Sequence, residues 1–353
     1  MMRFVFALLF IPNQQNGMTL LQHACYQGNL QMVKFLITEG ASINHYKQNE
    51  GYTALMFASL MGHIPIIKLL LEFGARHQDT NKVNRTAAEM AGFVGKHVAV
   101  SVLNNYVEKS TLKKYSLPDG PSSRIRLQSE FVNELAAIVN DFNFMPVKIF
   151  KKLSASYRKK DKSILMSATQ IANDVLEDLI NQNFTSHNMN ETVALKLHFI
   201  ATIFRFSQEN INLEEKKESS FYPLYGITRK FLLNSRTKEE KFMFDALKSY
   251  KYTDSTLWQG IVKHVASSCN EENKASPKRI ILKHINCTSP SFAEDIAHIC
   301  STCEAYEGTD ETTIKMKSCS ACHKIFYCSK DCQVMHWFIH KKNCTQSAQE
   351  DEN

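Results

Sequence analysis

The chain has 353 residues, of which 44% are hydrophobic, 22% are charged and 10% are aromatic, and its formal net charge is +7. This composition allows two or three domains with cores of their own and excludes a largely disordered chain. The 42 basic and 35 acidic residues are spread along the sequence without a dense basic block, so the charge does not require a nucleic-acid partner.

The first segment, residues 1–15, opens with an apolar run that contains a lone Arg3. The run looks superficially like a signal peptide, but no small-x-small cleavage site follows it. It is also too short to span a bilayer, so no membrane span is expected. We interpret residues 1–15 as part of a further repeat or as an alternative start of the chain, with secretion as the alternative.

From Gly17 the sequence repeats itself. The stretch GMTLLQHACYQGN returns 34 residues later from Gly51 as GYTALMFASLMGH, and a third copy places Thr86 33 residues after Thr53. This period and pattern resemble ankyrin repeats, in which each unit is a hairpin turn followed by two antiparallel helices. An ankyrin-repeat solenoid is therefore predicted for residues 16–107, with a threonine as N-cap of each first helix and glycines at the helix ends.

No unit of the repeat combines a nucleophile, a base and an orienting group, so the repeats predict an interaction surface. Resemblance to ankyrin proteins implies that this surface consists of the hairpin tips and the exposed end of each first helix. The corresponding residues are Tyr26, Gln27, Asn49, Glu50, Tyr52, Leu60, Met61 and Phe93. Apolar side chains gathered on one side are typical of a partner site, and the alternative is that they only cover the inner helices.

A linker is predicted for residues 108–123, because SLPDGPSS at 116–123 is rich in turn-forming residues. Beyond it, apolar residues recur at three- and four-residue spacing and predict an all-α middle domain over residues 124–295. The predicted helices cover 129–142, 167–180, 192–205, 238–250 and 255–266. The middle domain has no H-E-x2-H metal motif, no G-x-S-x-G nucleophile motif and no glycine-rich phosphate-binding loop, so no catalytic residues are assigned.

Seven of the ten cysteines lie between Cys300 and Cys344. With one histidine they form four pairs, which are Cys300/Cys303, Cys319/Cys322, Cys328/Cys332 and His340/Cys344. A structural zinc ion takes four sulfur or nitrogen ligands, so eight ligands predict two closed sites that stabilise a fold and leave no position for a substrate. A disulfide framework would need an oxidising compartment and is typical of small secreted chains, so the clustering favours metal.

Around these ligands the sequence reads CSACHKIFYCSKDCQVMHWFIHKKNC, which resembles the MYND zinc finger closely. The spacing alone does not decide which pairs share an ion, but the resemblance implies an interleaved arrangement. One zinc ion would be bound by Cys300, Cys303, Cys328 and Cys332, and the other by Cys319, Cys322, His340 and Cys344. His336 competes with His340 for the ligand position, and both the spacing to Cys344 and the family pattern favour His340.

Related MYND domains bind short proline-containing peptides in a shallow groove, and the positions that line it correspond to Ser320, Gln333 and Trp337 here. Gln333 and Trp337 are four residues apart and share a helix face, which suits an extended proline-rich ligand. The alternative is that Trp337 only packs over the zinc sites, because small metal domains have little other core.

The order of parts resembles that of the ankyrin repeat and MYND domain-containing proteins, on MNETVALKLHFI in the middle and HWFIHKKNC near the end. The finger is placed at 298–345, ahead of an acidic tail at 346–353, and chelation is expected to unfold the finger alone. The resemblance implies a non-enzymatic, cytoplasmic adaptor with protein partners, with ciliary signalling or trafficking as its setting. One alternative is a relative of the SET-domain methyltransferases, which also carry MYND fingers. Another is a transcriptional corepressor subunit.

Overall fold

The computed structural model describes residues 17–344, apart from gaps at 47–49, 122–125, 142, 157–161, 186–189, 214–227, 229–234, 269–276, 287–297, 306–314 and 343. The chain divides into two compact units, Met1–Tyr106 with Asn286–Ser289, and Val107–Ile285 with Pro290–Asn353. The fold is mainly α-helical, as predicted. No helix among the residues placed by the structure is both long and apolar enough to cross a membrane.

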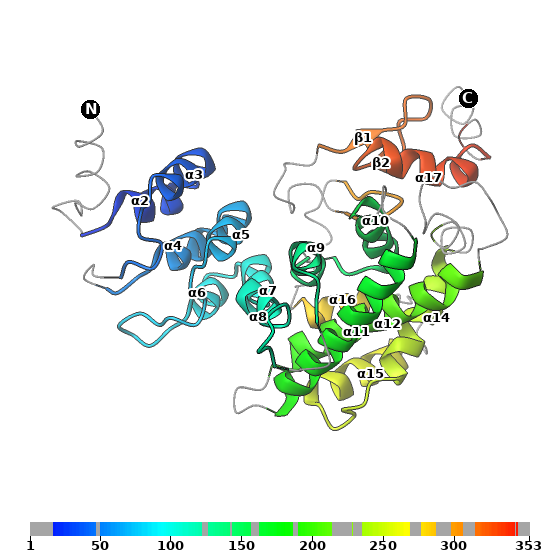
Figure 1. Ribbon diagram of the computed structural model, residues 1–353. Helices are drawn as coiled ribbons and strands as arrows, with labels where there is room; N and C mark the ends of the chain where they lie inside the picture. The colour runs from blue at the N-terminus through cyan, green and yellow to red at the C-terminus, as the bar shows by residue number, and fades with distance from the viewer. Residues whose placement is uncertain are drawn as a thin grey trace. The chain divides into compact units, whose positions relative to one another are not determined.

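The described residues of the first unit form three helix pairs that stack in step (Figure 1). They are α2 (Leu20–Gln27) with α3 (Leu30–Thr38), α4 (Ala54–Met61) with α5 (Ile64–Glu72), and α6 (Ala87–Phe93) with α7 (His97–Asn104). Their core consists of apolar residues of the second helices together with small residues of the first helices. Val33, Ile67 and Leu70 are completely buried, and so are Ala58 and Ala91. The pairs therefore form the predicted solenoid.

The predicted caps of the repeat helices are confirmed. The hydroxyl of each N-cap threonine accepts a hydrogen bond from the backbone N–H three residues on, at Thr19, Thr53 and Thr86. Gly28 ends α2 in the left-handed region with φ +76°, and the His63 ring lies directly above it, where a Cβ atom would come within 2.5 Å. Gly28 is therefore required both by its backbone conformation and by the close approach of the next ankyrin repeat.

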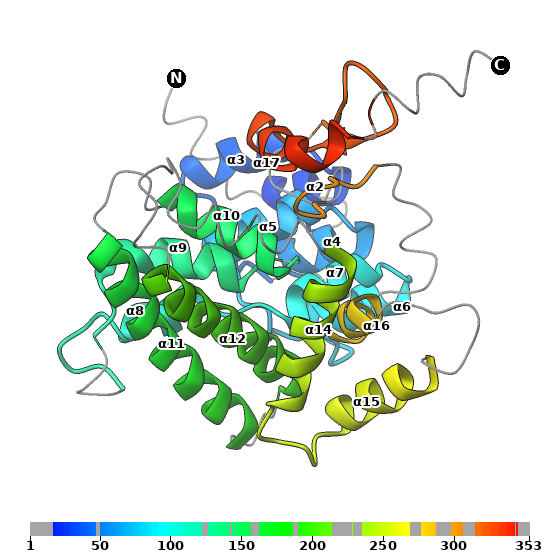
Figure 2. The same cartoon turned by 90° about the vertical axis from the view of Figure 1, so that its right-hand side faces the viewer.

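Among its described residues, the second unit opens with eight helices. They are α8 (Lys109–Lys114), α9 (Ser129–Val139), α10 (Pro146–Ser156), α11 (Lys162–Thr185), α12 (Glu191–Leu213), α14 (Ser235–Lys248), α15 (Thr256–Ser268) and α16 (Pro277–Ile285). The two longest helices, α11 and α12, run side by side (Figure 2). Phe144, Phe150, Phe199 and Phe204 are completely buried in the shared core. The sequence patterns predicted α9, α11, α12, α14 and α15 but missed α8, α10 and α16.

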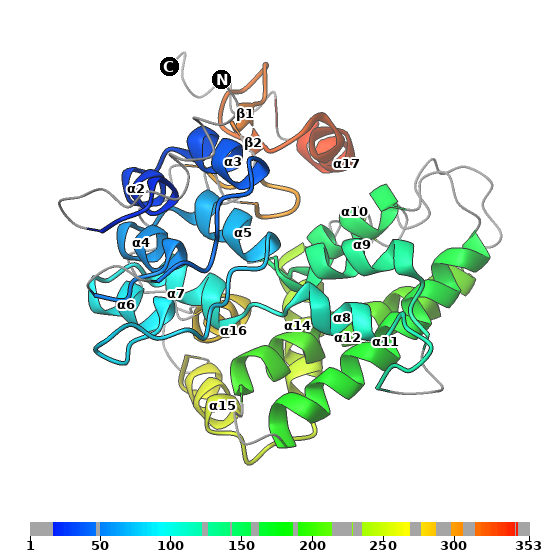
Figure 3. The same ribbon diagram turned by 60° about the vertical axis from the view of Figure 1, so that its left-hand side comes forward.

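The cysteine-rich segment follows these helices. Two short antiparallel strands, β1 (Lys317–Ser318) and β2 (Phe326–Tyr327), precede α17 (Lys330–His340) (Figure 3). The buried cysteines of this segment and Tyr327 belong to the same hydrophobic cluster as the core of the middle helices. The finger and the helical domain therefore share one core, and chelation is expected to affect more than the finger.

Candidate metal centre

The first cluster joins the first and third cysteine pairs. Cys300 and Cys303 lie on a turn whose Ser301 N–H donates to the carbonyl oxygen of Phe326 in β2, at 2.9 Å. Cys328 follows β2, and Cys332 lies in the first turn of α17. The Sγ atoms of Cys303, Cys328 and Cys332 are 3.5–3.7 Å apart, and all four ligand atoms lie within 4.8 Å of one another.

The second cluster joins the second and fourth pairs. Cys319 follows β1, His340 is the last residue of α17, and Cys322 and Cys344 complete the set. The Sγ atoms of Cys319 and Cys344 are 3.7 Å apart, and the Sγ atom of Cys322 lies 3.4 Å from Nε2 of His340. All four residues of the cluster are buried. The two ligand sets are those that the MYND resemblance implied.

Both clusters fit tetrahedral zinc. Zn–S bonds of about 2.3 Å and Zn–N bonds of about 2.05 Å place ligand atoms about 3.6–3.8 Å apart in a tetrahedron. The distances between the ligand atoms are close to this, whereas a disulfide would bring two sulfur atoms to about 2.05 Å. All seven cysteines are free of disulfides. The donor sets therefore fit two zinc ions, each with four protein ligands.

The two Cys-x2-Cys turns have the same backbone geometry. In each turn the residue after the second cysteine has a left-handed backbone. These residues are Glu304, with φ of 53°, and His323, with φ of 54°. Each N–H donates at 2.9 Å to the carbonyl oxygen of the first cysteine, Cys300 or Cys319. In the second turn, burial of Cys319 opposes ionisation of its thiol. Hydrogen bonds from the backbone N–H groups of Cys322 and Ala321 outweigh this and lower the pKa of Cys319 to about 6. The second turn thus favours the thiolate form of Cys319.

The structure distinguishes the two candidate histidines. His340 points Nε2 into the second cluster, whereas Nδ1 of His336 lies 3.0 Å from the Tyr327 hydroxyl. The two imidazole rings are stacked with centroids 6.1 Å apart. Burial, and then the neighbouring His340, lower the pKa of His336. His336 therefore supports the ligand and the fold of the finger, and it lies outside both ligand sets.

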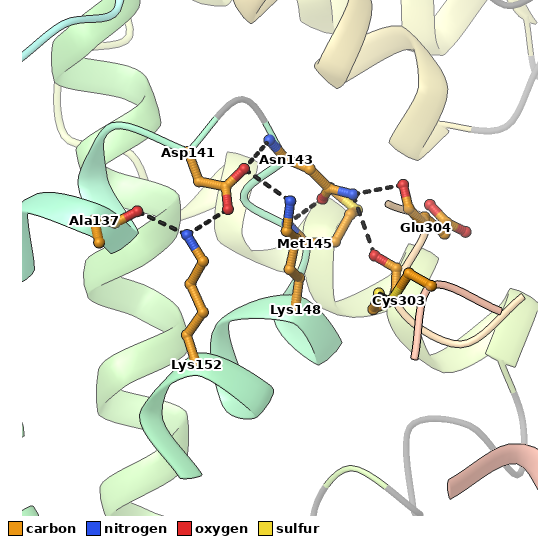
Figure 4. Close-up of polar contacts among 9 residues, drawn as sticks. Ala137, Asp141, Asn143, Met145, Lys148, Lys152, Cys303 and Glu304 are labelled. Carbon is orange, nitrogen blue, oxygen red and sulfur yellow. Dashed lines mark hydrogen bonds and ion pairs between the residues drawn. The ribbon is translucent and has the colours of Figure 1, made fainter. Parts of the chain in front are cut away.

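Two residues of the helical domain that no motif predicted touch the first cluster. Lys151 of α10 points its ammonium group at the Sγ atoms of Cys332 and Cys328, at 3.1 and 3.6 Å. Asn143, in the segment before α10, donates from Nδ2 to the carbonyl oxygens of Cys303 and Glu304 (Figure 4). Burial alone would lower the pKa of Lys151, but the thiolates of Cys332, Cys303 and Cys328 raise it above its ordinary value.

The predicted peptide-binding residues of the finger lie at its surface. Trp337 is 45% exposed, and its ring meets the His340 imidazole edge to face at 5.9 Å. Ser320 is exposed, and Gln333 is half-buried on the same helix as Trp337. Trp337 thus both packs on a zinc ligand and keeps a free face, so the two readings of its role are compatible.

The predicted partner residues of the repeats differ in exposure. Tyr26, Met61 and Phe93 are 40%, 38% and 74% exposed, and Gln27 and Glu50 are exposed as well. Tyr52 and Leu60 are half-buried, while Asn49 lies outside the described residues. Tyr26 and Tyr52 both make T-shaped contacts with the buried Phe57 ring, at centroid distances of 6.2 and 5.4 Å. The core therefore supports the two tyrosines from below.

Comparison with known proteins agrees with this architecture. Residues 3–83 match the family model of ankyrin repeats (3 copies), and residues 300–344 match that of the MYND finger. The chain is similar to Dauer abnormal formation protein 25 of Caenorhabditis elegans, at 27% identity over 94% of this chain and 82% of that protein.

Two further relatives match only a short part of the chain. The Drosophila melanogaster zinc finger MYND domain-containing protein 10 homolog is 38% identical over 53 residues, which are 15% of this chain and 10% of that protein. The SET domain and MYND-type zinc finger protein 6 of Schizosaccharomyces pombe is 39% identical over 67 residues, 19% of this chain and 12% of that protein. With ankyrin repeats and a MYND finger on one chain, and a relative that matches 94% of it, the resemblance to the ankyrin repeat and MYND domain-containing proteins is confirmed.

Proposed function

We propose that the chain is a non-enzymatic adaptor. It binds one protein through the exposed side of the ankyrin repeats and an extended, proline-containing segment of another protein through the finger. Holding two partners on one chain raises their effective concentration without new chemistry. The cytoplasm, and within it the cilium, is the proposed setting.

The observation that carries this proposal is the surface of the finger above a closed metal site. Each cluster has four protein ligands, which is the coordination of a structural zinc ion. The exposed face of Trp337 and the half-buried amide of Gln333 lie one helical turn apart on α17. An aromatic face beside an amide is suited to a polyproline-type peptide, whose extended shape is preformed.

A second surface supports the adaptor hypothesis. Tyr26, Met61 and Phe93 come from the first helices of three successive units and are all exposed. Ankyrin repeats and MYND fingers are both interaction modules. A chain that carries both suits two protein partners.

The finger can be tested with a panel of proline-containing peptides against the full chain. We expect Trp337→Ala to weaken binding at least ten-fold, as for aromatic residues that dominate interfaces. Val334→Ala is the matched control, because Val334 is an apolar residue of α17 that is 56% exposed and is not predicted to contact the peptide. Equal binding by the wild type and Trp337→Ala would contradict the peptide site.

The two-surface hypothesis is tested by affinity capture with Trp337→Ala and with the double variant Met61→Glu/Phe93→Glu. Each variant is expected to lose a different set of partners, so each controls for the other. Loss of the same set by both variants would contradict two separate surfaces. Methyl transfer from labelled S-adenosylmethionine would refute the non-enzymatic role. Accumulation of the tagged chain in the nucleus would favour a corepressor.

A further inference from the structure

The first zinc site lies against a lysine of another part of the chain. Lys151 Nζ is 3.1 Å from the Sγ atom of Cys332, 3.6 Å from that of Cys328 and 3.0 Å from the hydroxyl oxygen of Ser329. Lys151 and these residues are 177 to 181 positions apart in the sequence. The ammonium group therefore reaches the thiolates from α10, across the boundary between the helical domain and the finger.

The charge of the site explains what a lysine does there. Zinc-bound cysteines are thiolates, so four of them with one divalent ion carry a net charge of about −2, against about −1 for three cysteines and a histidine. The first cluster is thus the more negative of the two, and it is largely buried. An ammonium group that donates to the sulfur atoms of this cluster offsets part of the negative charge and stabilises the thiolates.

Asn143 holds the backbone of the same site. Its amide donates to the carbonyl oxygens of Cys303 and Glu304 at 3.2 and 2.7 Å, and it is buried. Its own orientation is fixed, because its N–H donates to Asp141 and its Oδ1 accepts from the N–H of Met145, both at 3.0 Å (Figure 4). The carbonyl oxygens of the first cysteine turn therefore accept hydrogen bonds from an amide whose orientation the helical domain has already fixed.

A network of buried and partly exposed charges fixes the segment that presents these two residues. Asp141 pairs with Lys148 at 2.9 Å and with Lys152, and the Lys152 ammonium also donates to the carbonyl oxygen of Ala137 (Figure 4). On the finger side, the Glu304 carboxylate pairs with Lys278, which also binds Glu239. Lys151 is thus the α10 lysine directed at the metal site, while its neighbours in the sequence stabilise the segment itself.

We propose that the helical domain completes the first zinc site. Lys151 acts as an outer-sphere cation for the Cys300/Cys303/Cys328/Cys332 cluster and Asn143 fixes its first turn, so that zinc retention at this site and docking of the finger on α10 are one coupled equilibrium. Lys151 is a positioning residue here, because it acts on the metal through the ligands.

The test uses the full chain loaded with zinc and measures the rate at which each ion transfers to a chromophoric chelator. Co²⁺ substitution assigns the phases, because its visible absorption differs between four-cysteine and three-cysteine/histidine sites. Lys151→Met keeps the length of the side chain but removes its charge. Outer-sphere partners contribute about 10- to 100-fold to metal affinity, so we expect metal loss from the first site to accelerate by about that factor.

Three variants separate charge from packing. Lys330→Met removes an exposed lysine of α17 that is also close in sequence to Cys328 and Cys332, and it is expected to change the rate by less than two-fold. Lys151→Arg retains the charge and is expected to restore most of the slow release. Asn143→Asp, which turns carboxylate oxygens toward the two carbonyl groups, is expected to accelerate metal loss from the first site.

Hydrogen exchange of α10 tests the coupling independently. Removing the metal is expected to increase exchange at the backbone N–H groups of α10 in the wild type. Unchanged exchange in α10, or equal release rates for Lys151→Met and Lys330→Met, would overturn the proposal. Slow release by Lys151→Met together with fast release by Lys151→Arg would show that the lysine acts only through packing, and would overturn it as well.

Discussion

The polar contacts that define the repeats and those that define the unit with the finger differ in their reach along the chain. In the repeats, each capping threonine bonds a residue three positions away, and the pattern recurs in three units. In the second unit, Asn143 and Lys151 bond residues 160 to 181 positions away. We expect each local contact to add a small and separate amount to the free energy of unfolding, whereas the long-range contacts depend on one another. Five predictions test this difference.

Chelation should have the largest effect. Structural zinc contributes on the order of 10–16 kcal/mol in isolated finger peptides. Both candidate clusters belong to the second unit, and the described part of the repeats contains no comparable group of metal ligands. We expect excess chelator to destabilise the finger and α10 while the repeat helices keep their protection from hydrogen exchange. Cooperative loss of both units would contradict the comparison.

Removing the buried carboxylate of Asp141 should have the second-largest effect on stability. Burial opposes ionisation of Asp141, but Lys148 and Lys152 hold its pKa well below the usual range. Asp141→Ala removes a buried counterion that two lysines share and should lower the free energy of unfolding by about 3–5 kcal/mol. The control is Asp79→Ala, because Arg76–Asp79 is an exposed ion pair of the repeats and should contribute less than about 1 kcal/mol. Denaturant titrations with equal losses would refute this.

Two glycines of the repeats separate backbone strain from crowding. Gly28 and Gly40 both have left-handed backbones, with φ of 76° and 88°, but only Gly28 has a neighbouring side chain where a Cβ atom would stand. Gly40→Ala should cost about 1 kcal/mol, and Gly28→Ala about 1–3 kcal/mol more because the His63 ring must move. Thermal unfolding measures both. Equal costs would show that the ring moves aside freely.

Loss of a single cap should be smaller still. The Thr53 hydroxyl accepts a hydrogen bond from the Met56 N–H at 3.2 Å. Thr53→Ala should lower stability by about 1 kcal/mol, since it leaves that N–H without its cap, and Thr53→Ser should retain most of it. Urea denaturation of the two variants measures the free energy of unfolding. A loss above about 3 kcal/mol for Thr53→Ala would show that the caps of the repeats do not contribute separately to stability.

The smallest effect should be a pH dependence of the second unit. Burial lowers the pKa of His198, whose Nε2–H donates to the carbonyl oxygen of Ala246 at 2.8 Å. A lowered folded-state pKa contributes stability that is complete above the ordinary imidazole pKa of about 6.5 and is lost as the pH falls below it. Urea denaturation followed by tryptophan fluorescence, between pH 7.5 and 5.5, should show this slope in the wild type, because Trp258 and Trp337 both lie in the second unit. A similar slope in His198→Gln would assign it to other groups.

The sequence predicted the elements that are encoded locally. Threonine and glycine spacing located the repeat helices, and cysteine spacing with the MYND resemblance gave both ligand sets. Helix α10 was missed although its features are in the sequence: Pro146 is suited to a helix start, and Val147, Phe150 and Leu153 are spaced for burial on one face. The roles of Lys151 and Asn143 could not be predicted, because no local pattern indicates which lysine meets a sulfur atom nearly two hundred residues away.

The junction at Asn143 also affects how the finger can be studied. A fragment cut near residue 298 would keep all eight zinc ligands, yet the carbonyl oxygens of Cys303 and Glu304 would face water instead of an amide, and the Cys332 sulfur would lose its ammonium neighbour. Ala305 and Met316, which are buried in the shared core, would form part of an uncovered apolar face. Peptide affinities and metal inventories measured on such an excised piece would describe a different molecule from the intact chain.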